Sequence, residues 1–306
     1  MRLALVLLLA AASAACDIGQ LTVNTTSKVL LRAQPSLQQE SDYELARQAI
    51  PGTLKTIESF WIVDPGNERL IRLLTEGFCQ YGTGFVEDDW EEAKLKQDLA
   101  ASEYHNERAT KIFNRCLNYA LRTLGPRWQK ELFGTQEVVA KLLLKQGGQR
   151  RRFAMLFAAL ALGSIVNHNL NQPDLLAYLP TVQKVLEHVL EMDKRWPEKN
   201  LAHAALPHIA LGMVHSGRPK AMGGDPDRAK HHFEEALRLT NNRFLLARTL
   251  MAYRVGLANN DRKFFHDQLK LVLETAPSVW PEQRLANEVA HRKARRYLSK
   301  EKELFQ

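Results

Sequence analysis

Three histidines lie close together between Leu201 and His215, namely His203, His208 and His215. Seven residues separate His208 from His215, and in a helix this spacing places both side chains on nearly one face. Imidazoles on a shared face could hold a metal ion, move protons or bind a ligand. Neither a His-x3-His pair nor a Cys-His set accompanies them, so we expect no metal site. Two interpretations stay open: polar groups satisfied around a helix kinked at Pro207, and a ligand-binding or proton-sensitive passage.

A second polar group follows directly, where Arg218 and Lys220 precede a Gly-Gly turn. Two cations beside such a turn could receive a carboxylate. The same stretch also has the residues that a tight turn and a helix start require, with Asp225 as N-cap and Pro226 at the first helical position. The sequence leaves both interpretations open.

The third candidate group is Asn167, His168, Asn169 and Asn171, which comes directly after the apolar run from residue 153 to 166. These polar side chains could line an internal cavity. They could equally cap the free carbonyl groups at the end of a buried helix.

Catalytic motifs are absent from the sequence. It contains no GxSxG, Walker loop, HExxH or EF-hand pattern. Glu58-Ser59 faintly resembles the Glu-Ser of helical lytic transglycosylases, but the Gly-rich glycan-binding motifs do not follow. We therefore expect a binding protein, with no catalytic residue and no cofactor.

The elements that position these groups are predicted to be helices throughout, because apolar residues recur at intervals of three and four. Ser41 and Glu44 fit a capping box that opens a helix toward Trp61. Asp64-Pro65 and Asp225-Pro226 are each expected to start a helix, with Asp as the N-cap. The apolar run from 153 to 166 is too short to cross a membrane and predicts a buried central helix.

Two repeats organise the chain. WPEKNLA, from Trp196 to Ala202, returns as WPEQRLA, from Trp280 to Ala286, each time after Val-Leu-Glu, and we interpret the phrase as the joint of a helical hairpin whose second helix starts near the proline. RATKIFNRCL, from Arg108 to Leu117, and RAKHHFEEAL, from Arg228 to Leu237, resemble the second helix of a tetratricopeptide repeat.

Within the second repeat, Ala109 and Ala229 would allow close helix approach, and Phe113 and Phe233 would fill the space between helices. The expected fold is all-α, with irregular tetratricopeptide-like helical hairpins stacked into one compact solenoid-like domain. Cys116 occupies the small position of this repeat. We therefore favour a free buried thiol over a Cys79–Cys116 disulfide, and the disulfide stays open as the alternative.

The N-terminus resembles a bacterial lipoprotein signal. MRLALVLLLAAASAAC has one arginine, an apolar run and small residues ending in Cys16, which is the expected site of lipid attachment. An ordinary export signal is the alternative. Asp17 resembles the residue that keeps lipoproteins in the inner membrane, with the outer membrane as the alternative. The expected organisation is a signal peptide over 1–15, a polar tether over 16–40 and a helical-repeat domain over 41–306.

Net charge narrows the class of partner. The formal net charge is +8, but in an exported protein a basic balance is not a sign of nucleic-acid binding, and we expect none. Anionic lipid head groups and acidic protein surfaces are the available counterparts.

Several segments together resemble the T component associated with TRAP transporters, a family of periplasmic lipoproteins built from tetratricopeptide-like helices. The segments are ESFWIVDPGNERLIRLLTEGFCQYGTGFVEDDWEEA, RATKIFNRCLNYALRTLG, HIALGMVHSGRPKAMGGDPDRAKHHFEEAL, FLLARTLMAYRVGLANNDRKFFHDQLKLVLETAP and RLANEVAHRKARRYL. SGRPKAMGGDPDRAKHHFEEAL is the most specific of these stretches. The resemblance extends from about Tyr43 to Leu298.

The resemblance implies a periplasmic, lipid-anchored protein that docks a solute-binding P component and forms oligomers, possibly trimers. It also implies an organic acid as the class of solute. On this basis the candidate partner or ligand surface is made of His208, His215, Arg218, Lys220, Asn167 and Asn169. A general tetratricopeptide-like scaffold in envelope assembly, and direct ligand binding in a cavity of the protein's own, are the alternatives.

Overall fold

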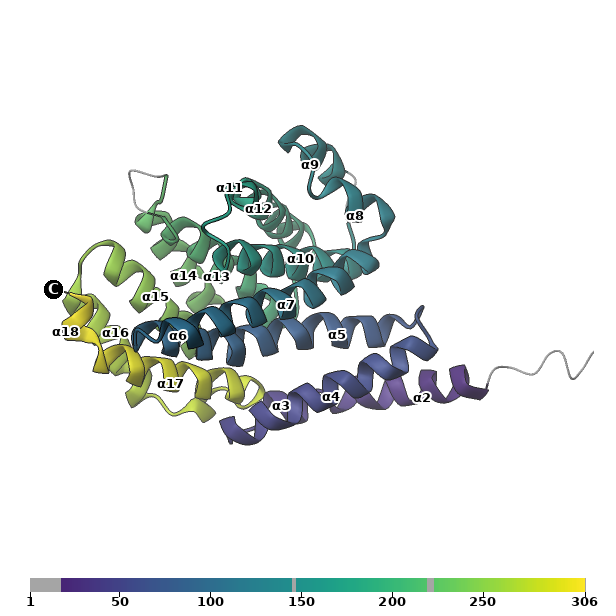
Figure 1. Ribbon diagram of the computed structural model, residues 1–306, viewed down its shortest axis with the longest axis horizontal. Coiled ribbons are helices and arrows are strands. Elements are labelled where there is room, and N and C mark those ends of the chain that lie inside the picture. The colour runs from purple at the N-terminus through teal and green to yellow at the C-terminus, as the bar shows by residue number, and fades with distance from the viewer. Residues whose placement is uncertain (1–17, 145–146, 219–222, 306) are drawn as a thin grey trace, which may run out of the picture.

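The computed structural model describes residues 18–144, 147–218 and 223–305, and these residues contain helices and no strand. All-α architecture is therefore confirmed. Figure 1 shows the helices packed against one another in a single stack. Their bounds are α2 Ile18–Ala33, α3 Pro35–Gln38, α4 Tyr43–Val63, α5 Glu68–Tyr81, η1 Gly82–Val86, α6 Glu87–Leu95, α7 Leu99–Leu124, α8 Pro126–Glu131, α9 Gln136–Leu143, α10 Gln149–Asn167, α11 Pro173–Leu176, α12 Leu179–Arg195, α13 Leu201–Ser216, α14 Pro226–Leu239, α15 Leu245–Ala258, α16 Arg262–Glu274, η3 Pro277–Val279, η4 Pro281–Gln283, α17 Arg284–Ser299 and α18 Glu301–Leu304.

In the first large hairpin, α5, η1 and α6 together form one side and α7 forms the other. The segments α5, η1 and α6 follow one another without a break, and η1 is a π-helical turn at Gly82–Val86. Both α5 and α6 pack against α7. Such π turns are frequent at functional sites because they re-aim the side chains around them.

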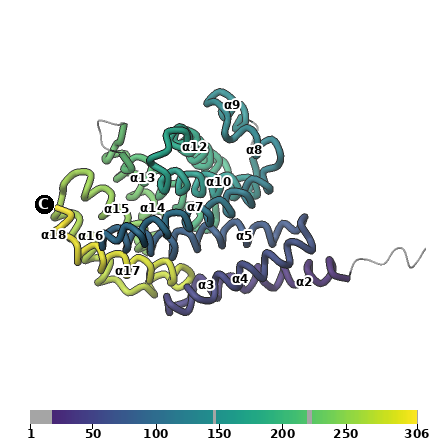
Figure 2. The backbone as a smooth tube through the Cα atoms, viewed as in Figure 1, coloured from purple at the N-terminus to yellow at the C-terminus, as the bar shows by residue number. Residues whose placement is uncertain are grey.

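Later hairpins repeat this arrangement. The helix pairs α10 and α12, α13 and α14, and α15 and α16 pack together, and α14 also packs on α15. Figure 2 shows α15 and α16 beside α17 at the C-terminal end of the stack, where both pack on it. Because successive helices reverse direction, α13 and α15 run the same way and contact each other directly.

Glycine and phenylalanine form close contacts between paired helices. A Cβ at Gly82 would lie 2.8 Å from the ring of Phe113, and a Cβ at Gly212 would lie 2.8 Å from the ring of Phe233. Ala109 and Ala229 are fully buried at the same repeat positions. The packing roles predicted for the Arg-Ala-x3-Phe repeat are therefore confirmed.

The repeated Trp-Pro-Glu phrase lies between α12 and α13 and again between α16 and α17, as the hairpin interpretation requires. The helix start predicted at Pro197 was wrong, because Asn200 caps α13, four residues after Trp196. In the second copy Pro281 is the first residue of a short 3-10 helix that continues directly into α17, so this start is confirmed. Trp196 is exposed whereas Trp280 is buried against Phe244.

Helix α10 is the buried central helix that the sequence predicts. Apolar side chains are buried on all its sides, from Phe153 to Val166, and α5, α7, α12 and α13 all pack on it. Among the described residues, none of the helices is both long and apolar enough to cross a bilayer.

The N-terminal segment differs from the predicted tether. Residues 18–38 form α2 and α3, and α2 packs on α4 and α5 through Val23 and Ser27. In Figure 1, α2 and α4 lie along the lower edge of the stack. The sequence did not predict this helix, because few of its residues face inward. The exposed apolar side chains Ile18, Leu21 and Val29 also weaken its helical hydrophobic periodicity.

Two helix starts were placed wrongly. The N-cap of α4 is Asp42 and not Ser41, because the Asp42 carboxylate accepts hydrogen bonds from the Glu44 and Leu45 amides. Asp64 ends α4, and Asn67 caps α5. The third prediction is confirmed, since Asp225 accepts a hydrogen bond from the Arg228 amide and α14 begins at Pro226.

Cys79 and Cys116 form a disulfide that joins α5 to α7. The free-thiol interpretation was therefore wrong. The small repeat position of Cys116 faces the neighbouring helix as expected, and this close approach is what brings the Cα atoms of the two cysteines to 5.4 Å.

A buried ionic network fastens the C-terminal helix α17 to α6. Fully buried Asp88 accepts hydrogen bonds from Arg292 and Arg296 at 2.7 and 2.6 Å. Glu91 accepts from Lys293 and Tyr297 at 2.7 and 2.5 Å. Figure 1 shows α17 beside α6. Residues about two hundred positions apart thus close the stack on itself.

Candidate functional site

A cavity of about 550 Å³ lies inside the stack. Helices α4, α5, α10, α13, α15 and α17 all contribute to its lining, together with the π-helical turn η1. This volume lies within the range of about 300–1,000 Å³ that is usual for small-molecule sites. The cavity is therefore the candidate functional site.

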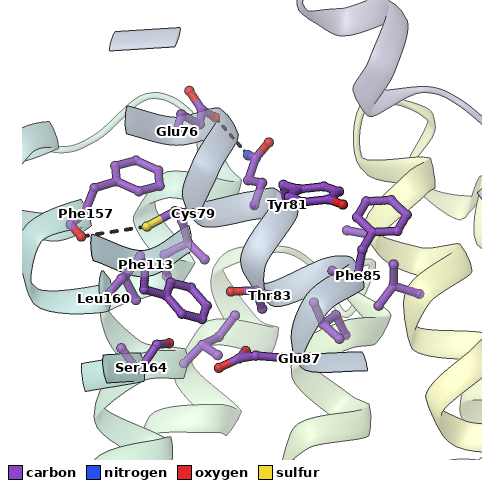
Figure 3. A pocket seen from close by; sticks show the side chains of 18 of the residues that line it. Glu76, Cys79, Tyr81, Thr83, Phe85, Glu87, Phe113, Phe157, Leu160 and Ser164 are labelled. Carbon is purple, nitrogen blue, oxygen red and sulfur yellow. Dashed lines mark hydrogen bonds between the residues drawn. The ribbon is translucent and has the colours of Figure 1, made fainter. Parts of the chain in front are cut away.

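Apolar side chains make most of the wall. Figure 3 shows Tyr81 and Phe85 of α5 and η1 on one side, and Phe113 and Phe157 of α7 and α10 on the other. The disulfide lies in this wall, with the Cys79 sulfur 3.9 Å from the Phe157 carbonyl oxygen. Further apolar residues line the remaining sides, namely Leu54, Ile57, Leu160, Leu206, Ile209, Met213, Leu246, Leu250 and Val289.

Carboxylates in the lining all have partners. Glu76 lies 3.0 Å from Nε2 of His203 and accepts a hydrogen bond from Gln80. Burial alone would raise the pKa of Glu76, but the hydrogen bond and charge of His203 outweigh burial and lower it. Glu87 lies 3.1 Å from Nε2 of His168.

The third carboxylate, Glu91, belongs to the ionic network with α17. Burial again opposes ionisation, yet Lys293 and Arg296 hold the pKa of Glu91 below its usual range. Since Lys293 also lines the cavity and is already neutralised by Glu91, this pair presents no net charge to a ligand.

Two arginines of the lining, unlike the charged groups above, have no ionic partner among the described residues. Within residues 18–144, 147–218 and 223–305, neither Arg218 nor Arg254 forms an ion pair. Nε of Arg218 is buried without a hydrogen-bond partner. The Arg254 guanidinium lies 6.0 Å from the centre of the Tyr253 ring. The predicted cation Arg218 thus reaches the cavity, whereas Arg254 was not foreseen.

The predicted polar group after α10 is divided. Asn167 lines the cavity. Asn169 instead donates to the Ile165 carbonyl and the Thr110 hydroxyl, so it satisfies the helix end. His168 is buried between Asn106, 2.7 Å from Nδ1, and Glu87. Both interpretations of this group therefore hold, each for different residues.

The predicted histidine face meets a second helix rather than the cavity. Nδ1 of His208 lies 3.1 Å from Nδ1 of His232 on α14, and the ring of His215 stacks on that of His232 with centres 5.6 Å apart. Burial, followed by the charge of neighbouring histidines, lowers the pKa of His232 to about 4. Burial likewise lowers the pKa of His208 and His215.

Some sequence candidates cannot be placed. Cys16 and Lys220 lie outside the described residues, so lipid attachment and the second cation of the Arg218 loop stay predictions. Among the residues that are described, no group of three or more His, Cys, Asp or Glu side chains could hold a metal ion.

Sequence reasoning missed Glu76, His203 as its partner, and Arg254. A usable signal existed for Arg254, because Leu246, Leu250 and Tyr253 recur at helical spacing beside it and mark the inward face of α15. No local pattern links Glu76 to His203, since the two lie 127 residues apart.

Comparison with known families gives a match over nearly all of this helical domain. The model of the family described as TRAP transporter T-component matches residues 39–305, which include the cavity helices α4 to α17. A search of curated proteins finds no match. Because the family match covers far more than half of the chain, the protein belongs to the TRAP transporter T-component family.

Proposed function

We propose that this protein is the periplasmic, lipid-anchored T component of a TRAP-type uptake system, that it docks a solute-binding P component, and that its cavity receives the transported solute. The family match supports the association with a TRAP system. The observation that carries the solute-binding part is the mostly apolar cavity of about 550 Å³, most of whose lining lies within the matched domain.

Physical reasons favour binding over chemistry in this cavity. Its wall is mostly apolar, and the carboxylates that line it are held by cationic or amide partners. Such a site can bind a solute reversibly by removing the solute's apolar surface from water, without any chemical step. The family is one of transporter accessory proteins, which fits a role in solute handling.

The membrane attachment belongs to the same proposal. Residues 1–15 serve as the signal peptide, Cys16 carries the lipid, and Asp17 favours the inner membrane. Since α2 begins at Ile18 and packs on α4 and α5, the anchor holds the domain close to the bilayer. A homo-oligomer, possibly a trimer, completes the proposed arrangement.

Docking is tested by expressing the complete chain in its native host, solubilising the membranes mildly and identifying the co-purifying proteins by mass spectrometry. Stoichiometric recovery of a solute-binding protein is expected. Recovery of envelope-assembly proteins instead would overturn the transport proposal and favour a general scaffold. A Cys16→Ser variant is expected to leave the membrane fraction, and unchanged membrane retention would contradict lipid anchoring.

A further inference from the structure

We infer that the outward face of α2 lies in the head-group region of an anionic phospholipid bilayer, so that the helix rests on the membrane without crossing it. This inference goes beyond the proposed function, and one of its three arguments rests on the lipid anchor proposed there. The contact is made by a stripe along α2, called here the α2 stripe, which consists of Ile18, Leu21, Thr25 and Val29.

Exposure of apolar side chains along α2 is the first argument. Ile18, Leu21 and Val29 are 78%, 61% and 61% exposed. At about 100° per residue, these three side chains share one side of the helix with Thr25. Val23 and Ser27, the buried residues of α2, lie on the opposite side, where α2 packs on α4 and α5. Scattered exposed apolar residues are ordinary, but a stripe along one helix face marks an interaction surface.

The threonines on this side of α2 do not oppose contact with lipid. The Thr22 hydroxyl donates to the Ile18 carbonyl at 2.8 Å, and the Thr25 hydroxyl donates to the Leu21 carbonyl at 3.1 Å. Because both donors have acceptors within α2, moving them out of water leaves neither donor unsatisfied. Both threonines can therefore lie against lipid at little cost.

The end of the adjacent helix extends the apolar surface. Ile62 and Val63, the last two residues of α4, are also exposed. Figure 1 shows this end of α4 and the first turn of α2 at the same end of the stack. The start of α5, which follows, is fixed beside α2, because Arg69 donates a hydrogen bond of 3.1 Å to the Asn24 side chain. Exposed apolar side chains thus gather where α2 begins.

The position of the anchor is the second argument. Ile18 follows the proposed lipid-bearing residue Cys16 by two positions, and two residues span at most about 7 Å. With Cys16 at the membrane surface, the first turn of α2 lies against the bilayer. Helices in the membrane interface bury their apolar face by about 5–10 Å, and the short connection permits this depth. The apolar side chains of the stripe add to the lipid anchor and do not replace it.

Charge complementarity is the third argument. Lys28 and Arg32 are the charged residues of α2, both are exposed, and both border the α2 stripe. Cations beside an apolar stripe are typical of helices that bind anionic membranes, because their long side chains reach the head groups. Pairing of two α2 helices across a two-fold axis would instead bring like charges together. A lipid surface therefore fits this face better than a second copy of the chain.

The test measures where α2 lies relative to lipid and water. The complete lipid-bearing chain is purified from membranes of its host and inserted into vesicles of phosphatidylethanolamine and phosphatidylglycerol. Leu21→Cys and Val29→Cys are each labelled with an environment-sensitive fluorophore, which Cys79 and Cys116 do not take up because they form the disulfide. Leu144→Cys is the matched control, since Leu144 is 79% exposed and ends α9, which Figure 1 shows on the opposite side of the stack.

Two quenchers report the position of each label. Iodide quenches labels in water, and lipids that carry a nitroxide on the acyl chain quench labels inside the bilayer. We expect the two α2 labels to be at least about threefold less accessible to iodide than the control label, as interfacial burial predicts. The nitroxide lipids should quench the α2 labels and leave the control unchanged. Melting temperatures equal to that of the wild type confirm that the variants fold.

Three results would overturn the inference, and each has a different meaning. Equal iodide access for the α2 labels and the control, in protein that floats with the vesicles, would remove the membrane contact and leave the lipid anchor intact. Protection from iodide without quenching by the nitroxide lipids would show that protein, such as a second copy, covers the face. A chain that does not float with the vesicles, and whose Cys16 peptide has no added lipid mass, would contradict the proposed anchor as well.

Discussion

Gly212 of α13 and Phe233 of α14 form a very close contact between the two helices of one hairpin, because a Cβ at the glycine would lie 2.8 Å from the aromatic ring. Gly82 and Phe113 repeat the relationship at the same distance. Each pair sets how near its two helices approach, and the cavity wall depends on that spacing.

Gly212→Ala is therefore expected to destabilise the protein. The added methyl group must displace a fully buried ring, and overpacking of this kind typically costs about 1–3 kcal/mol. Gly52→Ala is the matched control, since nothing lies within 4 Å of its added Cβ and helix propensity predicts a gain of about 0.5–1 kcal/mol. Chemical denaturation measures both, and equal effects would contradict the close-packing argument.

Removal of the disulfide tests the link between α5 and α7. The Cys79→Ala, Cys116→Ala double variant should lose about 3–4 kcal/mol, because the bond closes a loop of 37 residues in the unfolded chain. Reduction of the wild-type protein should lower its melting temperature similarly. Two thiols that react in denaturant without reductant, assigned to these positions by mass spectrometry, would show that the bond does not form.

The ionic network between α6 and α17 makes Asp88→Asn a severe substitution. Removal of one partner leaves Arg292, Lys293 and Arg296 partly uncompensated in a buried site, at a typical cost of about 3–5 kcal/mol. The surface pair of Lys263 and Asp267 is the control, and Asp267→Asn should leave stability almost unchanged because both groups are solvent-exposed. Equal effects of the two variants would refute the structural role of Asp88.

Acid should weaken the same network. Burial would raise the pKa of Asp88, but Lys293 and Arg296 outweigh burial and hold that pKa well below its usual range. The folded state therefore keeps Asp88 ionised at pH values where the unfolded chain binds a proton. Its contribution is complete above the unfolded pKa, about 3.9, and declines as the pH falls below that value.

Histidines at the interface of α13 and α14 should affect stability at milder pH. The pKa of His232 falls from 6.5 to about 4 on folding, so the unfolded chain binds more protons between these values. The stability that neutral His232 contributes is fully present above pH 6.5 and is lost as the pH falls toward 4. Because the ring is partly exposed, we expect a loss of about 1–2 kcal/mol after allowance for screening.

Melting temperatures at pH 7 and pH 5 measure this effect. His232→Gln should flatten the dependence, since the groups around His232, namely His208, His215, His231 and Arg228, then meet a neutral side chain. His231→Gln, an exposed neighbour on the same helix, should retain most of it. A wild-type slope in the His232 variant would contradict the assignment.

Short sequence patterns correctly predicted those features of the fold that depend on residues close together in the chain. Periodicity identified the helices, and the start of α14 followed from Asp225 and Pro226 alone. The Ala and Phe positions of the Arg-Ala-x3-Phe repeat were also correct. A third hairpin, in which a Cβ at Gly256 would lie 2.9 Å from Cβ of Phe265, escaped notice because it lacks the Arg-Ala pair.

Features that depend on distant residues were beyond reach. Identical Trp-Pro-Glu phrases give an exposed Trp196 and a buried Trp280, because only the second has Arg243 and Phe244 beside it. The candidate-site residues likewise fall into two groups, one that lines the cavity and one that faces another helix. Arg218 and Asn167 reach the cavity, while His208 and His215 face α14, since the face that a helix presents is chosen by its neighbours.

The bonds from Asp88 to Arg292 and Arg296 also constrain how the chain folds during synthesis. Asp88 emerges about two hundred residues before its partners, so α6 carries an unneutralised carboxylate until α17 has been synthesised. Contacts between residues so distant in sequence slow folding. Earlier hairpins can form as they appear, but the interior closes only when α17 arrives.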